Sequence, residues 1–181
     1  MKTLAALTLC AGTTWALLGS PPNALAEPEQ LHHVYVTVYK GLLFDSVEPL
    51  ARDIANHGGD VKVFWHDYQR VDLQCPDLIV GHSQGGNAAI RQAVDCQNKG
   101  TPPKAIVVID AGRFPQTSVV PKEVRFACAS YYDPSHPIGG QYIYGHCKNT
   151  RVPGYSHLQM PSTPQVVRGV RQILNLLEHN Q

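Results

Sequence analysis

The sequence has few charged residues and no cluster of basic ones. Its 181 residues include 15 Lys and Arg against 14 Asp and Glu, and charged residues make up only 16% of the chain. A protein that binds nucleic acid through the phosphate backbone needs a basic surface. The composition therefore argues against nucleic acid as a partner. A hydrophobic content of 43% argues against a disordered chain and is typical of one globular domain of ordinary size.

The sequence also lacks long apolar runs and metal-binding spacings. Beyond residue 26, no segment approaches the roughly 18 apolar residues that a membrane-spanning helix needs. There is no Cys-x-x-Cys pair, and the nine histidines include no i, i+4 pair, so the spacings typical of a zinc site are missing. We therefore expect no integral membrane segment, no metal and no cofactor.

The first 26 residues have the features of an export signal. Lys2 is followed by an apolar stretch over residues 4–18, and Ala24-Leu25-Ala26 offers a small-residue cleavage site. Removal of this signal peptide, residues 1–26, would leave residues 27–181 as a single mature domain. We therefore expect an exported protein, either secreted or periplasmic.

Cleavage would also change the cysteine count. Of the five cysteines, Cys10 lies inside the expected signal, which leaves four. An even number of cysteines in an exported chain is typical of disulfides. Four cysteines allow three pairings, and the order of the predicted elements favours Cys75 with Cys96 and Cys128 with Cys147.

Short β-branched runs alternate with amphipathic stretches along the mature chain. This alternation predicts a parallel sheet covered by helices, because parallel strands need crossover connections. Two of the runs are almost entirely apolar, as expected for central strands covered on both faces. The predicted strands span residues 34–38, 61–65, 77–81, 105–109 and 124–129, and the predicted helices span about 47–57, 83–96 and 163–178.

The strongest chemical signal is Gly81-His82-Ser83-Gln84-Gly85, which lies between a predicted strand and a predicted helix. This G-x-S-x-G pattern is typical of a nucleophile elbow. The two glycines let strand and helix approach closely at a tight turn. Ser83 is then presented at the helix N-terminus, where backbone N–H groups favour an oxyanion. We therefore expect Ser83 to be a nucleophile.

With this motif, and over nearly all of the mature chain, the sequence resembles the α/β-hydrolase superfamily, and within it the small secreted lipases and esterases. The resemblance implies a minimal α/β-hydrolase fold, with a central, mostly parallel sheet flanked by helices and, as in a cutinase, no lid domain. It also implies a secreted serine ester hydrolase that works through an acyl-enzyme on a small-molecule ester. Without a lid, we expect short to medium acyl esters as substrates.

The resemblance implies that the catalytic groups follow the chain order nucleophile, acid, histidine. His157 lies in the loop before the last predicted helix and is the candidate general base. Two carboxylates are candidates for the acid: Asp133 follows the last predicted strand, and Asp110 ends the strand before it. Either could orient His157 and stabilise its charged form. The usual position of the acid, two strands beyond the nucleophile, favours Asp133.

Two segments are expected to supply the oxyanion hole. One donor is the backbone N–H of Gln84, which directly follows the nucleophile. The other is the N–H of Leu42 or of Gly41, in the loop after the first strand. This loop resembles the oxyanion loop of the superfamily, with Lys40-Gly41 where many lipases have His-Gly.

Two alternative functions stay open from the sequence. A thioesterase or acyltransferase would use the same residues, because both reactions pass through an acyl-enzyme. A non-catalytic binding protein could keep the fold without the activity, because fold does not imply function.

Overall fold

The structure is a computed structural model that describes residues 33–41, 47–66, 74–113, 119–124 and 127–180. These residues all belong to one unit of the chain, His32–Gln181. The expected signal peptide, residues 1–26, lies outside the described residues, as does Leu42 of the expected oxyanion loop.

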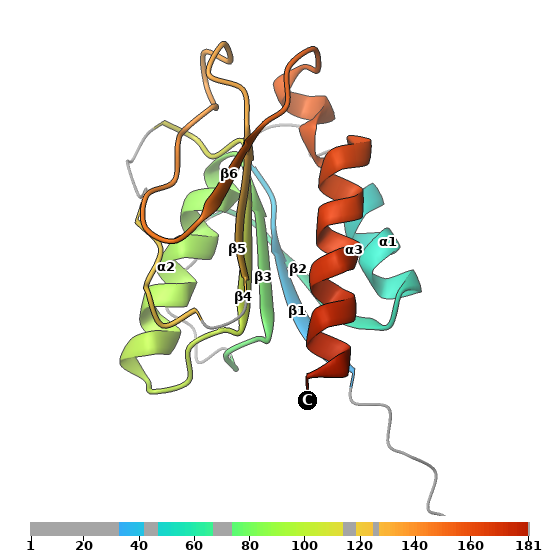
Figure 1. Ribbon diagram of the computed structural model, residues 1–181, viewed down its shortest axis with the longest axis vertical. Coiled ribbons are helices and arrows are strands. Elements are labelled where there is room, and N and C mark those ends of the chain that lie inside the picture. Colours follow the sequence, from blue (N-terminus) through green and yellow to red (C-terminus); the bar gives the residue numbers. More distant parts are fainter. Residues whose placement is uncertain (1–32, 42–46, 67–73, 114–118, 125–126, 181) are drawn as a thin grey trace, which may run out of the picture. The chain divides into compact units, whose positions relative to one another are not determined.

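One sheet of six parallel strands forms the centre of this unit (Figure 1). Its strand order is β2-β1-β3-β4-β5-β6, so β2 is the edge strand beside β1, and the later strands follow in chain order on the other side of β1. The prediction of a parallel sheet is therefore confirmed. The strands are β1 Val34–Tyr39, β2 Gly59–Phe64, β3 Leu78–His82, β4 Ala105–Ile109, β5 Ala127–Tyr132 and β6 Lys148–Arg151.

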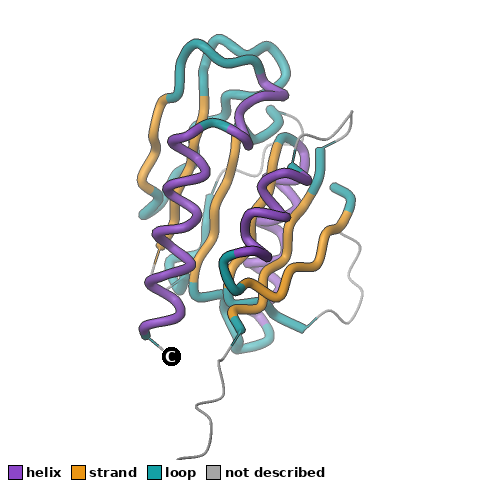
Figure 2. The backbone as a smooth tube through the Cα atoms, turned by 90° about the vertical axis from the view of Figure 1, so that its right-hand side faces the viewer, coloured by secondary structure: helices purple, strands orange, loops and turns teal. Residues whose placement is uncertain are grey.

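Helices cover both faces of the sheet. Helix α2, Gln84–Asn98, lies on one face against β1, β3 and β4. Helices α1, Glu48–Asn56, and α3, Pro164–His179, lie together on the other face (Figures 1 and 2). A short 3-10 helix, η1, spans His157–Ser162 directly before α3. None of the described helices is long and apolar enough to cross a membrane.

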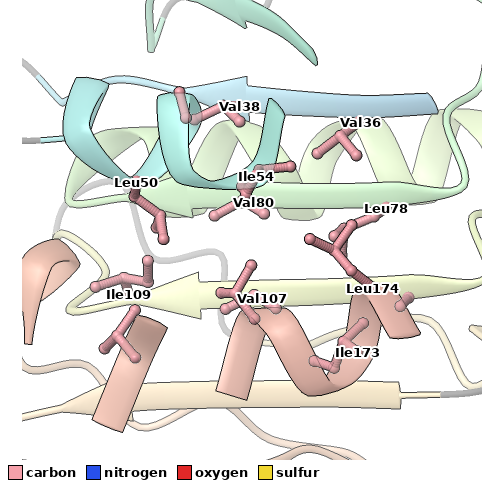
Figure 3. Packing of buried hydrophobic residues seen from close by; sticks show 14 of the residues in the cluster. Val36, Val38, Leu50, Ile54, Leu78, Val80, Val107, Ile109, Ile173 and Leu174 are labelled. Atoms are coloured by element: carbon pink, nitrogen blue, oxygen red, sulfur yellow. The ribbon is translucent and has the colours of Figure 1, made fainter. Parts of the chain in front are cut away.

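The sheet has a hydrophobic core on each of its two faces because its central strands are apolar on both sides. Every residue of β3 and β4 is buried, and their side chains alternate between the two faces. Figure 3 shows the core beneath α1 and α3. Its members include valines of β1, β3 and β4 and branched residues of the two helices: Val36, Val38, Val80, Val107, Leu50, Ile54, Ile173 and Leu174.

Two features of the sheet differ from the sequence-based prediction. Strand β5 spans Ala127–Tyr132 rather than residues 124–129, because Val124 belongs to a turn in which its N–H donates to the carbonyl of Pro121 (3.3 Å). Strand β6 was not predicted. It is short, polar and at the sheet edge, so it carries none of the apolar alternation that marks a strand in sequence.

Two disulfides link the pairs that the order of elements favours. Cys75 is bonded to Cys96, with 5.6 Å between their Cα atoms, and Cys128 to Cys147, with 4.4 Å. Cys75 precedes β3 and Cys96 lies in the last turns of α2, so the first bridge joins the ends of these elements that are remote from Ser83. Two disulfides fit an extracellular protein.

Reduction of these disulfides is expected to lower the melting temperature. The bonded cysteines are 21 and 19 residues apart, and a loop of this length corresponds to about 3 kcal/mol of chain entropy. In a domain of this size, the loss of that much stability lowers the melting temperature by roughly 6–12 °C for each bridge. Thermal unfolding with and without dithiothreitol measures the effect. A variant with all four cysteines changed to serine is the control, because reductant should not alter its melting temperature. Equal melting of the wild-type protein in both buffers would contradict the prediction.

Candidate active site

Ser83 occupies a sharp turn between β3 and α2. Its backbone has φ 57° and ψ −126°. This conformation is energetically unfavourable for any residue except glycine, and it is typical of a nucleophile elbow. Three hydrogen bonds hold the turn. The N–H of Ser83 donates to the carbonyl of Ile109 (3.0 Å), and its own carbonyl accepts from the N–H groups of Gly86 and Gly112 (2.9 Å each).

The glycines of the motif are required by close backbone contacts. A Cβ on Gly81 would lie 2.2 Å from the carbonyl oxygen of Gly85, and a Cβ on Gly85 would lie 2.4 Å from the carbonyl oxygen of Tyr39. Because both contacts are with backbone, no side-chain rotation could relieve them. The close approach of strand and helix expected from the sequence is therefore present.

His157 lies next to Ser83. Its Nε2 is 2.9 Å from the Ser83 Oγ, and each of the two residues is only 8% exposed. His157 is the first residue of η1, whose start is fixed by a capping box between Ser156 and Gln159. The structure thus brings together the predicted nucleophile and the predicted base, which are 74 residues apart in the sequence.

Asp110 completes the arrangement on the far side of His157. It follows β4 with φ 45°, is fully buried, and its Oδ2 accepts a hydrogen bond from His157 Nδ1 (2.5 Å). Its Oδ1 accepts from the N–H of Asp133 (3.1 Å). Burial opposes ionisation, but hydrogen bonds from His157, from the Asp133 N–H and from His136 outweigh it and hold the pKa of Asp110 below its usual value.

The side chain of Asp133 does not contact His157 in a hydrogen bond or an ion pair. Its carboxylate accepts from the N–H and the Oγ of Ser135 (3.0 and 2.9 Å) and lies 4.0 Å from the guanidinium of Arg151. The hydrogen bond from the Ser135 N–H, helped by the Ser135 hydroxyl and by the charges of His136 and Arg151, outweighs burial and lowers the pKa of Asp133. The sequence-based preference for Asp133 as the acid therefore does not fit the geometry: the carboxylate caps its own turn, and the hydrogen bond from Asp133 to Asp110 comes from its backbone N–H.

A second histidine shares the Asp110 carboxylate. His136 Nδ1 is 2.5 Å from Asp110 Oδ2, and His136 Nε2 is 2.8 Å from the carbonyl oxygen of Tyr155. Burial favours the neutral ring, but the hydrogen bonds to Asp110 and Tyr155 and the charges of Asp110 and Asp133 raise the pKa of His136 above its usual value. Sequence reasoning missed this residue, because it lies in a loop with no motif or periodicity around it.

Asp110, His136 and His157 form a group whose potential ligand atoms lie within 4.8 Å of one another. Ligands at zinc-like distances of about 2.0–2.1 Å in a tetrahedral site are roughly 3.3 Å apart. Here the two N···O distances are 2.5 Å, too short for two ligands of one zinc ion and closer to the roughly 2.7–2.9 Å of a charge-assisted N–H···O hydrogen bond. We therefore describe the group as two imidazoles hydrogen-bonded to one carboxylate.

Three further residues, His82, Gly139 and Arg113, surround His157 and its hydrogen bond to Asp110. His82 Nε2 donates to the carbonyl of His157 (3.0 Å), and the two rings pack with their centroids 4.8 Å apart. The backbone of Gly139 packs against the hydrogen bond between His157 and Asp110. A Cβ on Gly139 would be 2.5 Å from His157 Nδ1 and 2.7 Å from Asp110 Oδ2. Arg113 fixes this segment by donating through Nε to the carbonyl of Gly139 (2.8 Å). The hydrogen bond between His157 and Asp110 is therefore enclosed.

We expect Gly139→Ala to damage this arrangement. The added methyl group would overlap His157 Nδ1 and Asp110 Oδ2, so either the loop or the imidazole must move. A displacement of about 1 Å in a catalytic group costs on the order of 100-fold in rate, and kcat for ester hydrolysis measures it. Pro137→Ala, at an exposed position in the same loop, is the matched control and should keep near wild-type kcat. Equal kcat values for the two variants would contradict the prediction.

Gly41 of the expected oxyanion loop lies against Ser83. A Cβ on Gly41 would be 2.9 Å from the Cβ of Ser83, and Gln84 is the first residue of α2. Lys40 is engaged elsewhere, in an ion pair with Glu48 and above the ring of Trp65, 5.3 Å from its centroid. The backbone of Gly41, rather than the Lys40 side chain, therefore borders Ser83.

Known proteins resemble this chain in structure and not detectably in sequence. No protein-family model and no curated protein matches it. Human thioesterase 2 superposes with a TM-score of 0.50 at 14% identity, over 80% of this chain and 96% of that one. An esterase from Pyrobaculum calidifontis superposes with a TM-score of 0.51 at 13% identity, over 81% of this chain and 76% of that one. The chain has an α/β-hydrolase fold. In the α/β-hydrolase fold the G-x-S-x-G serine sits at the end of a strand on top of the sheet, as Ser83 does here, and no lid domain is present within the described residues.

Proposed function

We propose that this protein is a serine hydrolase that cleaves carboxylic esters through an acyl-enzyme, with Ser83, His157 and Asp110 as its triad. One observation carries the proposal: a continuous line of hydrogen bonds runs from Ser83 Oγ through both nitrogens of His157 to the carboxylate of Asp110. With Nδ1–H donated to the ionised carboxylate, Nε2 is left as the acceptor for the serine proton. The strained elbow supports the same role for Ser83.

In the acylation step, Ser83 Oγ attacks the carbonyl carbon of the ester while His157 Nε2 takes the hydroxyl proton. The carbonyl oxygen becomes an oxyanion, which the N–H of Gln84 and the N–H of Gly41 or Leu42 would stabilise. When this intermediate collapses, the bond to the alcohol oxygen breaks, and His157 returns the proton to that oxygen. The acyl group is left on Ser83.

In the deacylation step, a water molecule takes the place of the alcohol. His157 removes one proton from the water as its oxygen attacks the acyl carbon, and the same oxyanion donors act again. The bond to Ser83 Oγ then breaks, and the proton returns to the serine, which releases the carboxylic acid. In both steps, Asp110 keeps His157 in the required tautomer and stabilises its charged form.

Thioester hydrolysis is the second candidate, because a thiol can replace the alcohol as leaving group in the same acyl-enzyme scheme. The fold is found both in an esterase and in a thioesterase, which supports either reaction.

Two exposed apolar residues follow or precede residues of the site in the chain. Ile138 and Leu158 are 56% and 42% exposed and are chain neighbours of Gly139 and His157. We propose that these two exposed apolar side chains contribute to the acyl-binding surface, which would suit short to medium acyl groups.

We also propose that the protein is exported. The features of an N-terminal signal peptide over residues 1–26 support this, and so do the two disulfides, since such bonds persist in secreted and periplasmic proteins.

A fluorophosphonate probe tests the proposal directly. The probe should form a covalent bond with the activated serine, and peptide mapping should locate the label at Ser83. Initial rates on p-nitrophenyl butyrate and on a butyryl thioester then rank the two candidate reactions. A folded protein that neither reacts with the probe nor turns over either substrate would instead be a non-catalytic binding protein.

A further inference from the structure

We propose that His136 is a positioning residue held as an imidazolium, and that its charge lets the triad work at more acidic pH than Ser83, His157 and Asp110 would alone. The inference rests on the proposed function. Its starting point is that both nitrogens of His136 face hydrogen-bond acceptors. Nε2 lies 2.8 Å from the carbonyl oxygen of Tyr155, which can only accept, and Nδ1 lies 2.5 Å from Asp110 Oδ2.

The carboxylate of Asp110 is the acceptor in that second contact. Its Oδ2 also takes the hydrogen bond from His157 Nδ1 (2.5 Å), and its Oδ1 takes the N–H of Asp133 (3.1 Å). A neutral His136 could make its contact only by accepting a proton held on Asp110 Oδ2, yet that oxygen also accepts from His157, and its hydrogen bonds hold the pKa of Asp110 below its usual value. An ionised Asp110 therefore fits, and His136 must then donate from both nitrogens, which only the charged ring can do.

The charges around His136 agree with a cation at this place. The carboxylates of Asp110 and Asp133 both attract it, and its side chain is only 10% exposed. The other charged or titratable groups nearby belong to neighbouring segments. His157 packs edge-on with ring centroids 5.9 Å apart, Arg113 donates to the carbonyl groups of Pro134 and Gly139 in the same loop, and Arg151 lies beside Asp133.

The consequence for His157 follows from charge counting. In a simple triad, a buried carboxylate faces the histidine alone and attracts a proton to it, yet the general base must be neutral to accept the proton of Ser83. Here His136 already balances the charge of Asp110 and adds a positive charge near the His157 ring. This positive charge opposes the uptake of a further proton by the triad in acidic solution, while the hydrogen bond that orients the His157 ring is kept.

The variant His136→Gln tests this, because its side chain can donate a hydrogen bond but carries no charge. We expect the acid limb of the pH profile of kcat/KM for p-nitrophenyl butyrate to move to higher pH by about one unit, as one unit charge at this distance implies. The rate on the alkaline plateau should stay within about tenfold of wild type. His146→Gln, at an exposed histidine, is the matched control and should leave the limb in place. A purely structural role would lower kcat/KM equally at every pH, and an unmoved limb overturns the proposal.

A second measurement does not depend on catalysis. In 15N NMR spectra of the full folded protein, the His136 signals, assigned by their loss in His136→Gln, should report both ring nitrogens protonated, with a titration midpoint above 6.5. A midpoint at or below 6.5 overturns the proposal. If the wild-type protein hydrolyses no ester, the proposed function fails, whereas this titration still decides the charge of His136.

Discussion

Replacing Ser83 with alanine is expected to reduce ester hydrolysis by at least about 10⁴-fold and to leave the fold intact. The Oγ that the change removes is the atom that would carry the acyl group, and the members of a serine triad lose activity as a unit. The fold should tolerate the change because the turn is held by backbone groups of Ser83, Ile109 and Gly112, all of which alanine retains.

The measurement is the initial rate on p-nitrophenyl butyrate, with circular dichroism and the melting temperature as tests of folding. Ser162→Ala is the matched control, because Ser162 is exposed and its Oγ only donates to the carbonyl of Gln159 (3.0 Å). It should hydrolyse the ester at close to the wild-type rate. A Ser83→Ala protein that retains more than about one hundredth of the wild-type rate would rule out Ser83 as the nucleophile.

Asp110→Asn is expected to lower kcat by about 10³- to 10⁴-fold, because an amide in place of the carboxylate no longer stabilises the charged form of His157 and can hold the ring in the wrong tautomer. The loss should be deep because Asp110 is fully buried, so water cannot take over its role. The variant should also be less stable, since the N–H of Asp133 and the ring of His136 lose their charged acceptor.

Asp133→Asn provides the matched comparison, because it makes the same chemical change one strand further along the sheet. Its carboxylate accepts from Ser135 and lies near Arg151, and the contact of residue 133 with the site runs through its backbone, which the variant keeps. We expect kcat to fall by less than about tenfold. Parallel kcat measurements on the two variants at one pH decide the matter, and a larger loss for Asp133→Asn would return the assignment to that residue.

The elbow could be predicted from the sequence because everything that defines it is local. Gly81, Ser83 and Gly85 lie within five residues. The strand before them is a continuous apolar run, and the helix after them has an apolar stripe. The parallel sheet was predictable for a similar reason, since buried strands such as Ala105–Ile109 consist almost entirely of β-branched residues.

Which aspartate is hydrogen-bonded to His157 was not predictable in the same way, because two aspartates follow neighbouring strands and differ in where their side chains point. That direction depends on Ser135 and on the positive φ of Asp110, and neither leaves a sequence pattern. His136 was missed because its partners, Asp110 and Tyr155, are 26 and 19 residues away. Contacts between loops at one edge of a sheet arise only from the folded arrangement.

The strained backbone at Ser83 and Asp110 lowers the folding stability at the two residues that the proposed activity needs. They are the non-glycine residues with positive φ in the described part of the chain, and they stand at the two ends of the hydrogen-bonded line. Backbone strain of this kind costs on the order of 1–3 kcal/mol per residue, a sizeable share of a marginal folding free energy. Selection for thermal stability alone would therefore favour residues that relax these positions, such as glycine at 83 or asparagine at 110. A stabilised library of this protein should be screened for turnover at every round, because substitutions that relax these two positions would also remove the proposed catalytic groups.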